Sequence, residues 1–292
     1  MYSQIASNKR KSLLLMLIFI VVVAGLAWIF SKIYGGNADM VVIAIVFASG
    51  MSLISFFAGD KIALATAGAK AIAKQENPYV YRLVENLSIT AGIPTPKIHI
   101  INEPQMNAFA TGRDPKHSSI ALTTGLIAGL NNEELEGVVA HELSHIKNYD
   151  IRVMMVVIVC IGIITLLSDW LLHSFLWRGN RDHDNKAGGI LMIIGLVLAI
   201  LSPLFAQLIQ LAVSRKREFL ADASGALLTR YPEGLAKALE KISVQNANHP
   251  LRHSNKATAH LYFANPFKAE SVSKLFSTHP PVAERIKALR SM

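Results

Sequence analysis

The stretch His141-Glu142-Leu143-Ser144-His145 decides the fold class of this chain, because it has the form H-E-x-x-H. Residues four positions apart lie on one face of a helix, so both imidazoles can bind one Zn²⁺ ion. Glu142 follows the first histidine, where its carboxylate can accept a proton from an attacking water molecule. The alternative is a polar helix face whose histidines bind no metal. The pattern alone arises by chance in roughly one chain of this length per hundred, so the surrounding sequence has to decide.

The sequence around the motif predicts the helix that the motif requires. Asn131 is a favourable residue for capping a helix, and Glu134 stands at the position that completes a capping box. Leu135 and Val138 supply an apolar side for the first turns. We expect this helix to run from Asn131 through the motif toward Asn148.

A third zinc ligand is expected outside the motif, since a catalytic zinc takes three protein ligands and keeps one position open. Glu218 and Asp222, in the stretch Arg217-Glu218-Phe219-Leu220-Ala221-Asp222, are also four positions apart on a predicted helix. Glu218 can bind the metal, and Asp222 can accept a hydrogen bond from a ligand imidazole and so orient its ring. The alternative for both residues is a solvated pair among basic neighbours.

Four apolar runs hold most of the hydrophobic residues, which make up 52% of the chain against 17% charged. Roughly a quarter of a typical soluble domain is charged. Leu13 to Phe30 and Met40 to Phe57 are long enough to cross a bilayer as helices. Val153 to Leu167 and Gly189 to Val213 form either a second transmembrane hairpin, a re-entrant one or a hairpin buried in a soluble core. Two spans return the chain to its starting side, so the histidines and Glu218 can meet at one membrane face.

Basic residues at the ends of the first two runs predict the orientation in the membrane. They are Lys9, Arg10 and Lys11 before the first run, and Lys61, Lys70 and Lys74 after the second. The positive-inside rule therefore places both ends of this hairpin in the cytoplasm. We attribute the net charge of +9 to contact with an anionic lipid surface and expect no nucleic-acid partner, because no nucleic-acid module accompanies it. The single cysteine, Cys160, excludes an intramolecular disulfide.

The remaining patterns predict a mainly α-helical fold with a small β-sheet. Pro78 to Ala91 has helical spacing, with Tyr79, Leu83 and Leu87 on one face. The expected strands are Lys97 to Ile101, Asn107 to Gly112 and Ser118 to Leu122, and further helices are expected at Pro232 to Ile242 and Val282 to Leu289. We divide the chain into an N-terminal transmembrane hairpin (1–60), a first catalytic part with the motif (61–150), a second hairpin (151–213) and a second catalytic part with the third ligand (214–292).

The chain resembles the HtpX family of membrane zinc metalloproteases, which is more distantly related to the CAAX prenyl proteases. The resemblance covers nearly the whole chain, including the spacing of the apolar runs. The matching stretches are NAFATG at Asn107 to Gly112, HELSH at His141 to His145, REFLAD at Arg217 to Asp222, and HPP at His279 to Pro281 with Glu284-Arg285 after it.

The resemblance implies a zincin-like metalloprotease domain on the cytoplasmic side, one Zn²⁺ per chain, and a role in the quality control of membrane proteins. It implies that Asn107, Ala108, Phe109 and Ala110 form a sheet edge onto which the polypeptide substrate pairs; the alternative is that Phe109 is only a core residue. Pairing of this kind makes main-chain hydrogen bonds with little demand on sequence. The resemblance also suggests that His279 and Arg285 support the site or stabilise the oxyanion, while a loop histidine held by two prolines is the other interpretation of His279.

Other functions fit the sequence less well. An intramembrane protease would carry the motif within an apolar span, whereas polar residues from Lys147 to Asp150 follow it here. A CAAX-type endoprotease shares the chemistry but needs a larger chamber than four runs build. A catalytically idle scaffold or zinc-binding regulator has no use for Glu142. A transporter is not indicated, because the first two runs contain no ionisable residue. No feature of the sequence fixes the oligomeric state.

Overall fold

The computed structural model describes residues 2–33, 38–157, 215–248, 263 and 280–292, and every structural statement below refers to these residues. The fourth apolar run, most of the third run, Cys160 and His279 lie outside them. The start of the third run is helical, since residues 150–157 form a helix.

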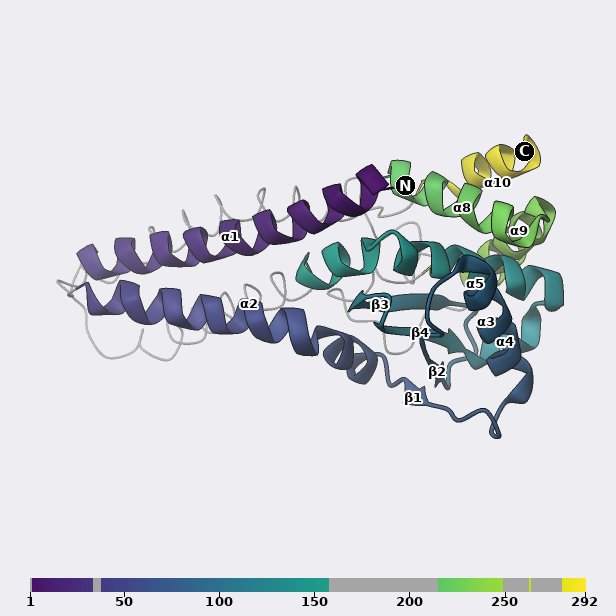
Figure 1. Ribbon diagram of the computed structural model, residues 1–292, viewed down its shortest axis with the longest axis horizontal. Helices are drawn as coiled ribbons and strands as arrows, with labels where there is room; N and C mark the ends of the chain where they lie inside the picture. The colour runs from purple at the N-terminus through teal and green to yellow at the C-terminus, as the bar shows by residue number, and fades with distance from the viewer. Residues whose placement is uncertain (1, 34–37, 158–214, 249–262, 264–279) are drawn as a thin grey trace.

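Two long helices extend from one end of the molecule as an antiparallel pair (Figure 1). They are α1, Tyr2–Ile33, and α2, Asp39–Thr66. Among the described residues, α2 is the one helix that is long and apolar enough to cross a membrane. It contains the predicted run from Met40 to Phe57 and continues beyond it. The crossing of the bilayer by Leu13 to Phe30, which lies within α1, stays a prediction.

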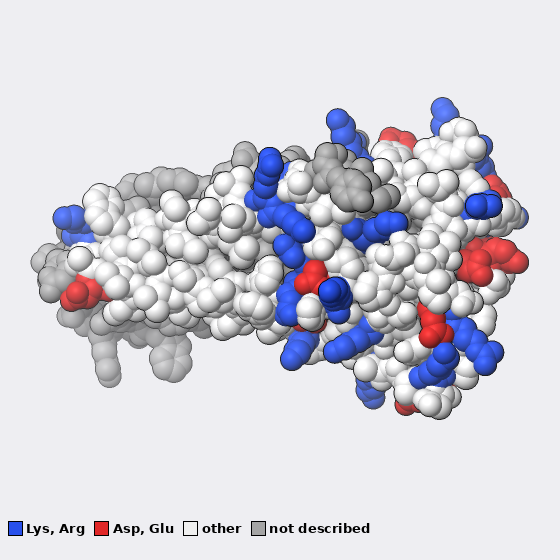
Figure 2. All heavy atoms as spheres, in the orientation of Figure 1, with Lys and Arg blue, Asp and Glu red and all other residues white. Residues whose placement is uncertain are grey.

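Charged side chains mark where this pair joins the rest of the protein. On the face shown in Figure 2, the described residues along the middle of the pair are uncharged. Lys and Arg side chains gather at the junction with the remaining elements. A hairpin in lipid would have this distribution, with its basic residues beside the headgroups, but the crossing of a membrane by the pair stays a prediction.

A four-stranded mixed sheet lies beside the junction. Its order is β1-β2-β4-β3, with β2 and β4 parallel and the other neighbours antiparallel, so β3 is an edge strand. The strands are β1, Lys70–Ala71; β2, Lys97–Ile101; β3, Ala108–Asp114; and β4, His117–Thr123. The three strands expected from the sequence are therefore present, with shifts of one or two residues at their ends. The two-residue β1 was not predicted, because it is too short to show an alternating pattern.

The helix α3, Pro78–Ala91, has the predicted bounds because both of its ends carry clear signals. The Asn77 side chain accepts a hydrogen bond from the Val80 backbone N–H, and Gly92 ends the helix in the left-handed conformation at φ 69°. Of the three residues expected on one face of this helix, Leu83 and Leu87 are buried, whereas Tyr79 is 47% exposed. The buried stripe follows positions 80, 83, 84 and 87, which is the wider stripe expected of a helix on a globular core.

The helix α5, Asn132–Lys147, is the central element of the catalytic part. The predicted capping box is present: Asn131 Oδ1 accepts from the Glu134 N–H, and Glu134 Oε2 accepts from the Asn131 N–H, each at 2.9 Å. Around α5 pack α3, the edge strand β3 and two C-terminal helices. The remaining helices are α4, Thr124–Gly129; α8, Arg215–Thr229; α9, Pro232–Asn248; and α10, Val282–Arg290. The helices α8, α9 and α10 confirm the patterns seen in the sequence, whereas the short α4 was not predicted.

Candidate metal centre

The helix α5 presents both motif histidines on one buried face. Their Nε2 atoms lie 3.1 Å apart, and the two rings are nearly perpendicular, at 88°. The Nδ1 atoms point the other way, each toward a carboxylate. The two Nε2 atoms therefore converge on one point, as the four-residue spacing predicts.

Glu218 of α8 supplies the third group at this point. Its Oε2 lies 3.7 Å from His141 Nε2 and its Oε1 lies 3.7 Å from His145 Nε2. The approach of α8 depends on Gly225, since a Cβ there would lie 3.0 Å from the His141 backbone nitrogen. The three side chains form a buried cluster whose ligand atoms all lie within 4.8 Å of one another.

The donor set fits a divalent metal ion. If each Nδ1 carries the proton that it donates to its carboxylate, both Nε2 atoms present lone pairs to each other and to the Glu218 carboxylate. Such an arrangement is repulsive unless a cation lies between the three groups. Tetrahedral zinc with ligands about 2.0–2.1 Å away separates neighbouring ligand atoms by about 3.3 Å. The observed separations of 3.1, 3.7 and 3.7 Å bracket this value.

Asp222 contacts the nitrogen of the His141 ring that faces away from the cluster, as expected from its place one helical turn after Glu218. Its Oδ1 lies 2.9 Å from His141 Nδ1. Arg285 of α10 donates to the same carboxylate from Nε at 2.8 Å and from Nη2 at 2.6 Å. Burial works against the ionised carboxylate, but these hydrogen bonds from Arg285 and His141 hold the pKa of Asp222 below its usual value. Asp222 is thus a fixed anion that holds one imidazole in one orientation.

Asp150 does the same for His145, and the sequence interpretation missed this role. Its Oδ2 lies 3.1 Å from His145 Nδ1, and its Oδ1 lies 3.7 Å from Arg217 Nη1. Asp150 follows the end of α5, after Tyr149 with φ 61°. Helical spacing places no residue beyond the end of a helix, so only the general need for a carboxylate behind each ligand histidine could have suggested it.

The two histidines differ in their affinity for a proton. Burial lowers the pKa of His141 to about 4, although the hydrogen bond and charge of Asp222 oppose the shift. Burial also disfavours the charged form of His145, but the hydrogen bond to Asp150 and the charges of Glu218, Asp150 and Glu142 raise its pKa to about 9. The carboxylates around the two rings therefore favour a positive charge at this cluster, which a bound metal ion would supply.

Glu142 is buried beside these ligands. Its charge raises the pKa values of both His145 and Arg285, which places it on the same side of α5 as the cluster. A buried carboxylate is uncommon in proteins unless it is paired or has a functional role. Its location agrees with the predicted general base.

Phe263 packs against the His141 ring, a contact that the sequence interpretation also missed. Its ring meets the His141 ring edge to face with centroids 5.0 Å apart, and the Arg285 guanidinium lies over the same ring at 4.9 Å. Its backbone N–H donates to the Ala108 carbonyl at 2.8 Å. No pattern singled it out, because the sequence around it shows neither helical nor strand periodicity.

The predicted substrate strand is the edge strand β3, which packs on α5. Asn107 directs its carbonyl toward β4, where it accepts from the Thr123 N–H. Peptide groups alternate in direction along a strand, so those of Ala108 and Ala110 face away from β4. The Phe109 side chain is fully buried, which agrees with a core role for that side chain beside any role of the backbone.

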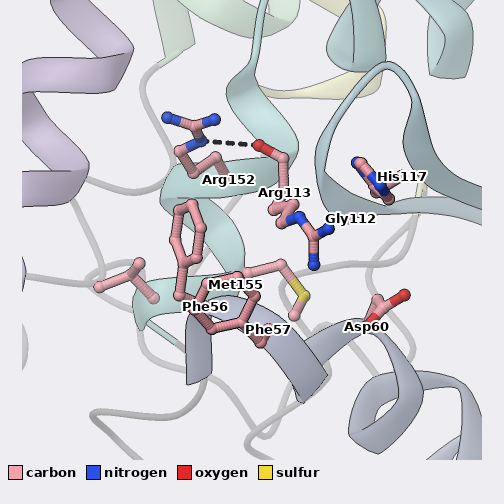
Figure 3. Close-up of a pocket in the computed structure, with 9 residues that line it drawn as sticks. Phe56, Phe57, Asp60, Gly112, Arg113, His117, Arg152 and Met155 are labelled. Atoms are coloured by element: carbon pink, nitrogen blue, oxygen red, sulfur yellow. Dashed lines mark hydrogen bonds between the residues drawn. The ribbon is translucent and has the colours of Figure 1, made fainter. Parts of the chain in front are cut away.

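A pocket at the junction with α2 is separate from the metal cluster (Figure 3). Arg152 donates from Nε to the Arg113 carbonyl at 2.6 Å within it. The lining residues are Phe56, Phe57, Asp60, Gly112, Arg113, His117, Arg152, Met155 and Val156. None of them is a ligand of the cluster, and Phe56, Phe57 and Asp60 come from α2, so the pocket lies where α2 meets the catalytic part.

This fold and site define a metallopeptidase of the H-E-x-x-H class, and comparison with known proteins gives its family. Residues 74–292 match the protein family described as "Peptidase family M48". The chain is 43% identical over 292 residues to a protein named "Protease HtpX homolog" from Tropheryma whipplei, covering 100% of this chain and 98% of that protein. A protein of the same name from Dictyoglomus turgidum is 45% identical, with coverage of 100% and 94%.

A solved structure shows a similar fold. It is titled "Crystal Structure of S. mikatae Ste24p" and superposes with a TM-score of 0.53 at 18% identity, covering 99% of this chain and 67% of that one. The chain belongs to peptidase family M48 and, within it, to the HtpX proteases. The resemblance seen in the sequence is thereby confirmed.

Proposed function

We propose that the chain is a membrane-anchored, zinc-dependent endopeptidase that hydrolyses peptide bonds in misfolded or damaged membrane proteins. The observation that carries this proposal is the convergence of His141, His145 and Glu218 on one point, with Glu142 buried beside it. The HtpX relatives support the class of reaction, and the apolar helix α2 supports the anchoring.

The residues of the chain divide the chemistry among them. A bound zinc ion supplies Lewis acidity, which polarises the scissile carbonyl and acidifies the attacking water. His141, His145 and Glu218 hold the ion, while Asp222 and Asp150 keep the two imidazoles in the tautomer that directs Nε2 inward. Glu142 accepts the proton of the water and passes it to the departing amine nitrogen.

The outward peptide groups of Ala110, and those of Ala108 once they are released from Phe263 and the Asn107 side chain, are the proposed site for the substrate backbone. An extended peptide added to this edge pairs through its main chain and so accepts many sequences, as removal of damaged proteins requires. The hydrogen bond from the Phe263 N–H to the Ala108 carbonyl is a contact of the kind that a substrate strand would make. For the support residues, the geometry favours Arg285 as the holder of Asp222; His279 remains a proposed neighbour of the metal.

The proposed topology has both hairpins in the plasma membrane and the catalytic parts, 61–150 and 214–292, in the cytoplasm. The basic residues around α1 and α2 support the orientation. The second hairpin, 151–213, returns the chain to the same side, so α5 and α8 meet as the structure shows.

The proposal is tested with full-length protein in detergent and unfolded casein as substrate. Protein stripped with a chelator should be inactive, and resupplied Zn²⁺ should restore cleavage. A prenylated peptide with a C-terminal CAAX sequence is the comparison substrate. Cleavage of that peptide with no attack on casein would favour a CAAX-type endoprotease, and bound zinc with no cleavage of either would favour the scaffold.

Replacing Glu218 with Ala should empty the metal site. The two histidines alone bind zinc far more weakly, so the zinc content of purified protein should fall by about tenfold or more at equal free zinc. Metal analysis after gel filtration measures it. Glu284→Ala, an exposed glutamate beside Arg285, is the matched control and should keep its zinc. An unchanged zinc content in the Glu218 variant would show that another residue is the third ligand.

A further inference from the structure

We propose that Asn8 of α1 is a positioning residue of the metal centre, which acts through Asp150 on His145. The inference rests on the proposed zinc site and adds to it a contribution from the first helix of the chain. Asn8 lies 142 residues before Asp150 in sequence, yet its Nδ2 donates to Asp150 Oδ1 at 2.7 Å. The anchoring helix is therefore also a structural part of the catalytic centre.

The hydrogen bond from Asn8 holds the Asp150 carboxylate at the oxygen that does not face His145. Oδ2 of that carboxylate faces His145 Nδ1 at 3.1 Å, and Oδ1 receives the amide of Asn8. The same amide donates to the Asn148 carbonyl at 2.9 Å. Both acceptors are oxygens, so the amide must present its NH₂ group, and its two N–H bonds match the two acceptors.

The burial of Asn8 and Asp150 makes the hydrogen bond between them important for the Asp150 carboxylate. Asn8 is 1% exposed and Asp150 is 2% exposed, so neither group reaches bulk water. A buried carboxylate needs hydrogen-bond donors for both of its oxygens. Asp150 has the imidazole of His145, the amide of Asn8 and the Arg217 guanidinium at 3.7 Å. Loss of the amide would leave Oδ1 facing only the more distant cation.

The loop that carries Asp150 is itself held by α1. Tyr149 has φ 61°, a conformation that is costly for a residue with a large side chain and persists only where neighbours impose it. Asn8 binds the residues on both sides of Tyr149, and Lys9 Nζ lies 4.5 Å from the centre of its ring. Two consecutive residues of α1 thus clamp this strained turn, which sets the direction of Asp150.

Apolar packing also connects α1 to the helical segment that begins at Asp150. Leu15 and Phe19 of α1 share a buried cluster with Val153 and Val156, from the helix that begins at Asp150. A displacement of α1 against the catalytic part would therefore move Asp150 directly. Asp222, which orients the other histidine, is held by Arg285 of α10 instead, so the proposal concerns His145 alone.

The test compares zinc dissociation from full-length protein in detergent. Asn8→Ala should speed the transfer of zinc to a chromophoric chelator by about tenfold, the lower end of the range for partners of ligand residues. Asn8→Asp, of equal size but without donors, should do so at least as strongly. Ser12→Ala is the matched control: Ser12 is equally buried in α1, and among the described residues its hydroxyl bonds only to the Asn8 carbonyl in its own helix. It should leave dissociation unchanged.

A double-mutant cycle separates positioning from simple stabilisation. If Asn8 acts through Asp150, Asp150→Ala should speed dissociation by about ten- to a hundredfold, and adding Asn8→Ala should have little further effect. Fully additive effects would overturn the proposal, and so would a lowered Tm with unchanged zinc dissociation. Failure of the wild type to retain zinc at all would instead contradict the proposed function.

Discussion

Glu142→Gln is expected to abolish proteolysis while zinc stays bound at the wild-type level. Gln has the size of Glu and keeps an acceptor oxygen, but it cannot take up a proton at neutral pH. General bases contribute about 100- to 10,000-fold to rate, so kcat on casein should fall by at least about 100-fold. Metal analysis and casein cleavage on the same preparation measure both quantities.

The control for this variant is Glu133→Gln, which removes an exposed carboxylate from the first turn of the same helix. It should keep both zinc and activity. If Glu142→Gln kept more than about a tenth of the wild-type rate, another group would have to be the base. If it lost zinc, Glu142 would contribute to holding the metal as well as to proton transfer.

Arg285→Met is expected to give the largest loss of stability of any single change near the site. Arg285 is 1% exposed and makes two hydrogen bonds to Asp222, so its removal leaves a buried carboxylate without its main partner. Breaking a buried ion pair from one side costs about 3–5 kcal/mol. Thermal unfolding in detergent should show a clear fall in Tm, together with faster loss of zinc because Asp222 no longer fixes His141.

Arg290→Met provides the comparison from the same helix. Arg290 also contacts two carboxylates, those of Glu233 and Glu240, but on the surface. Water screens exposed ion pairs, so they contribute little to stability and the Tm of this variant should change little. Equal effects at the two arginines would contradict the role given to Arg285. Combining Arg285→Met with Asp222→Leu should recover part of the stability, since no buried charge is left unpaired, but not the zinc affinity.

The elements with local signals could be predicted from the sequence. The capping box at Asn131 and Glu134 located the start of α5, and the motif located the ligands along it. Asn77, Pro78 and Gly92 determined both ends of α3. Glu218 could be suggested because it shares a helical face with Asp222, which lies four residues further on.

The contacts that complete the site had no such signal. Asp150 stands past the end of a helix, and Asn8 and Phe263 reach the site only through the tertiary fold. Each is a single residue without periodic neighbours, so nothing in its own segment announces the contact. The exposure of Tyr79 had no signal either: the spacing predicts which residues share a helix face, and only the packing of α3 decides which of them are buried.

The order of the ligand-bearing helices along the chain also sets when all residues of the site are present during synthesis. His145 is made first, Glu218 follows, and Arg285, which fixes Asp222, comes 140 residues after His145. At translation rates of about 5–20 residues per second, this gap lasts roughly 7–28 seconds. Until α10 has been synthesised, Asp222 lacks the guanidinium that fixes it, so the growing chain can hold its three metal ligands before it holds their full support.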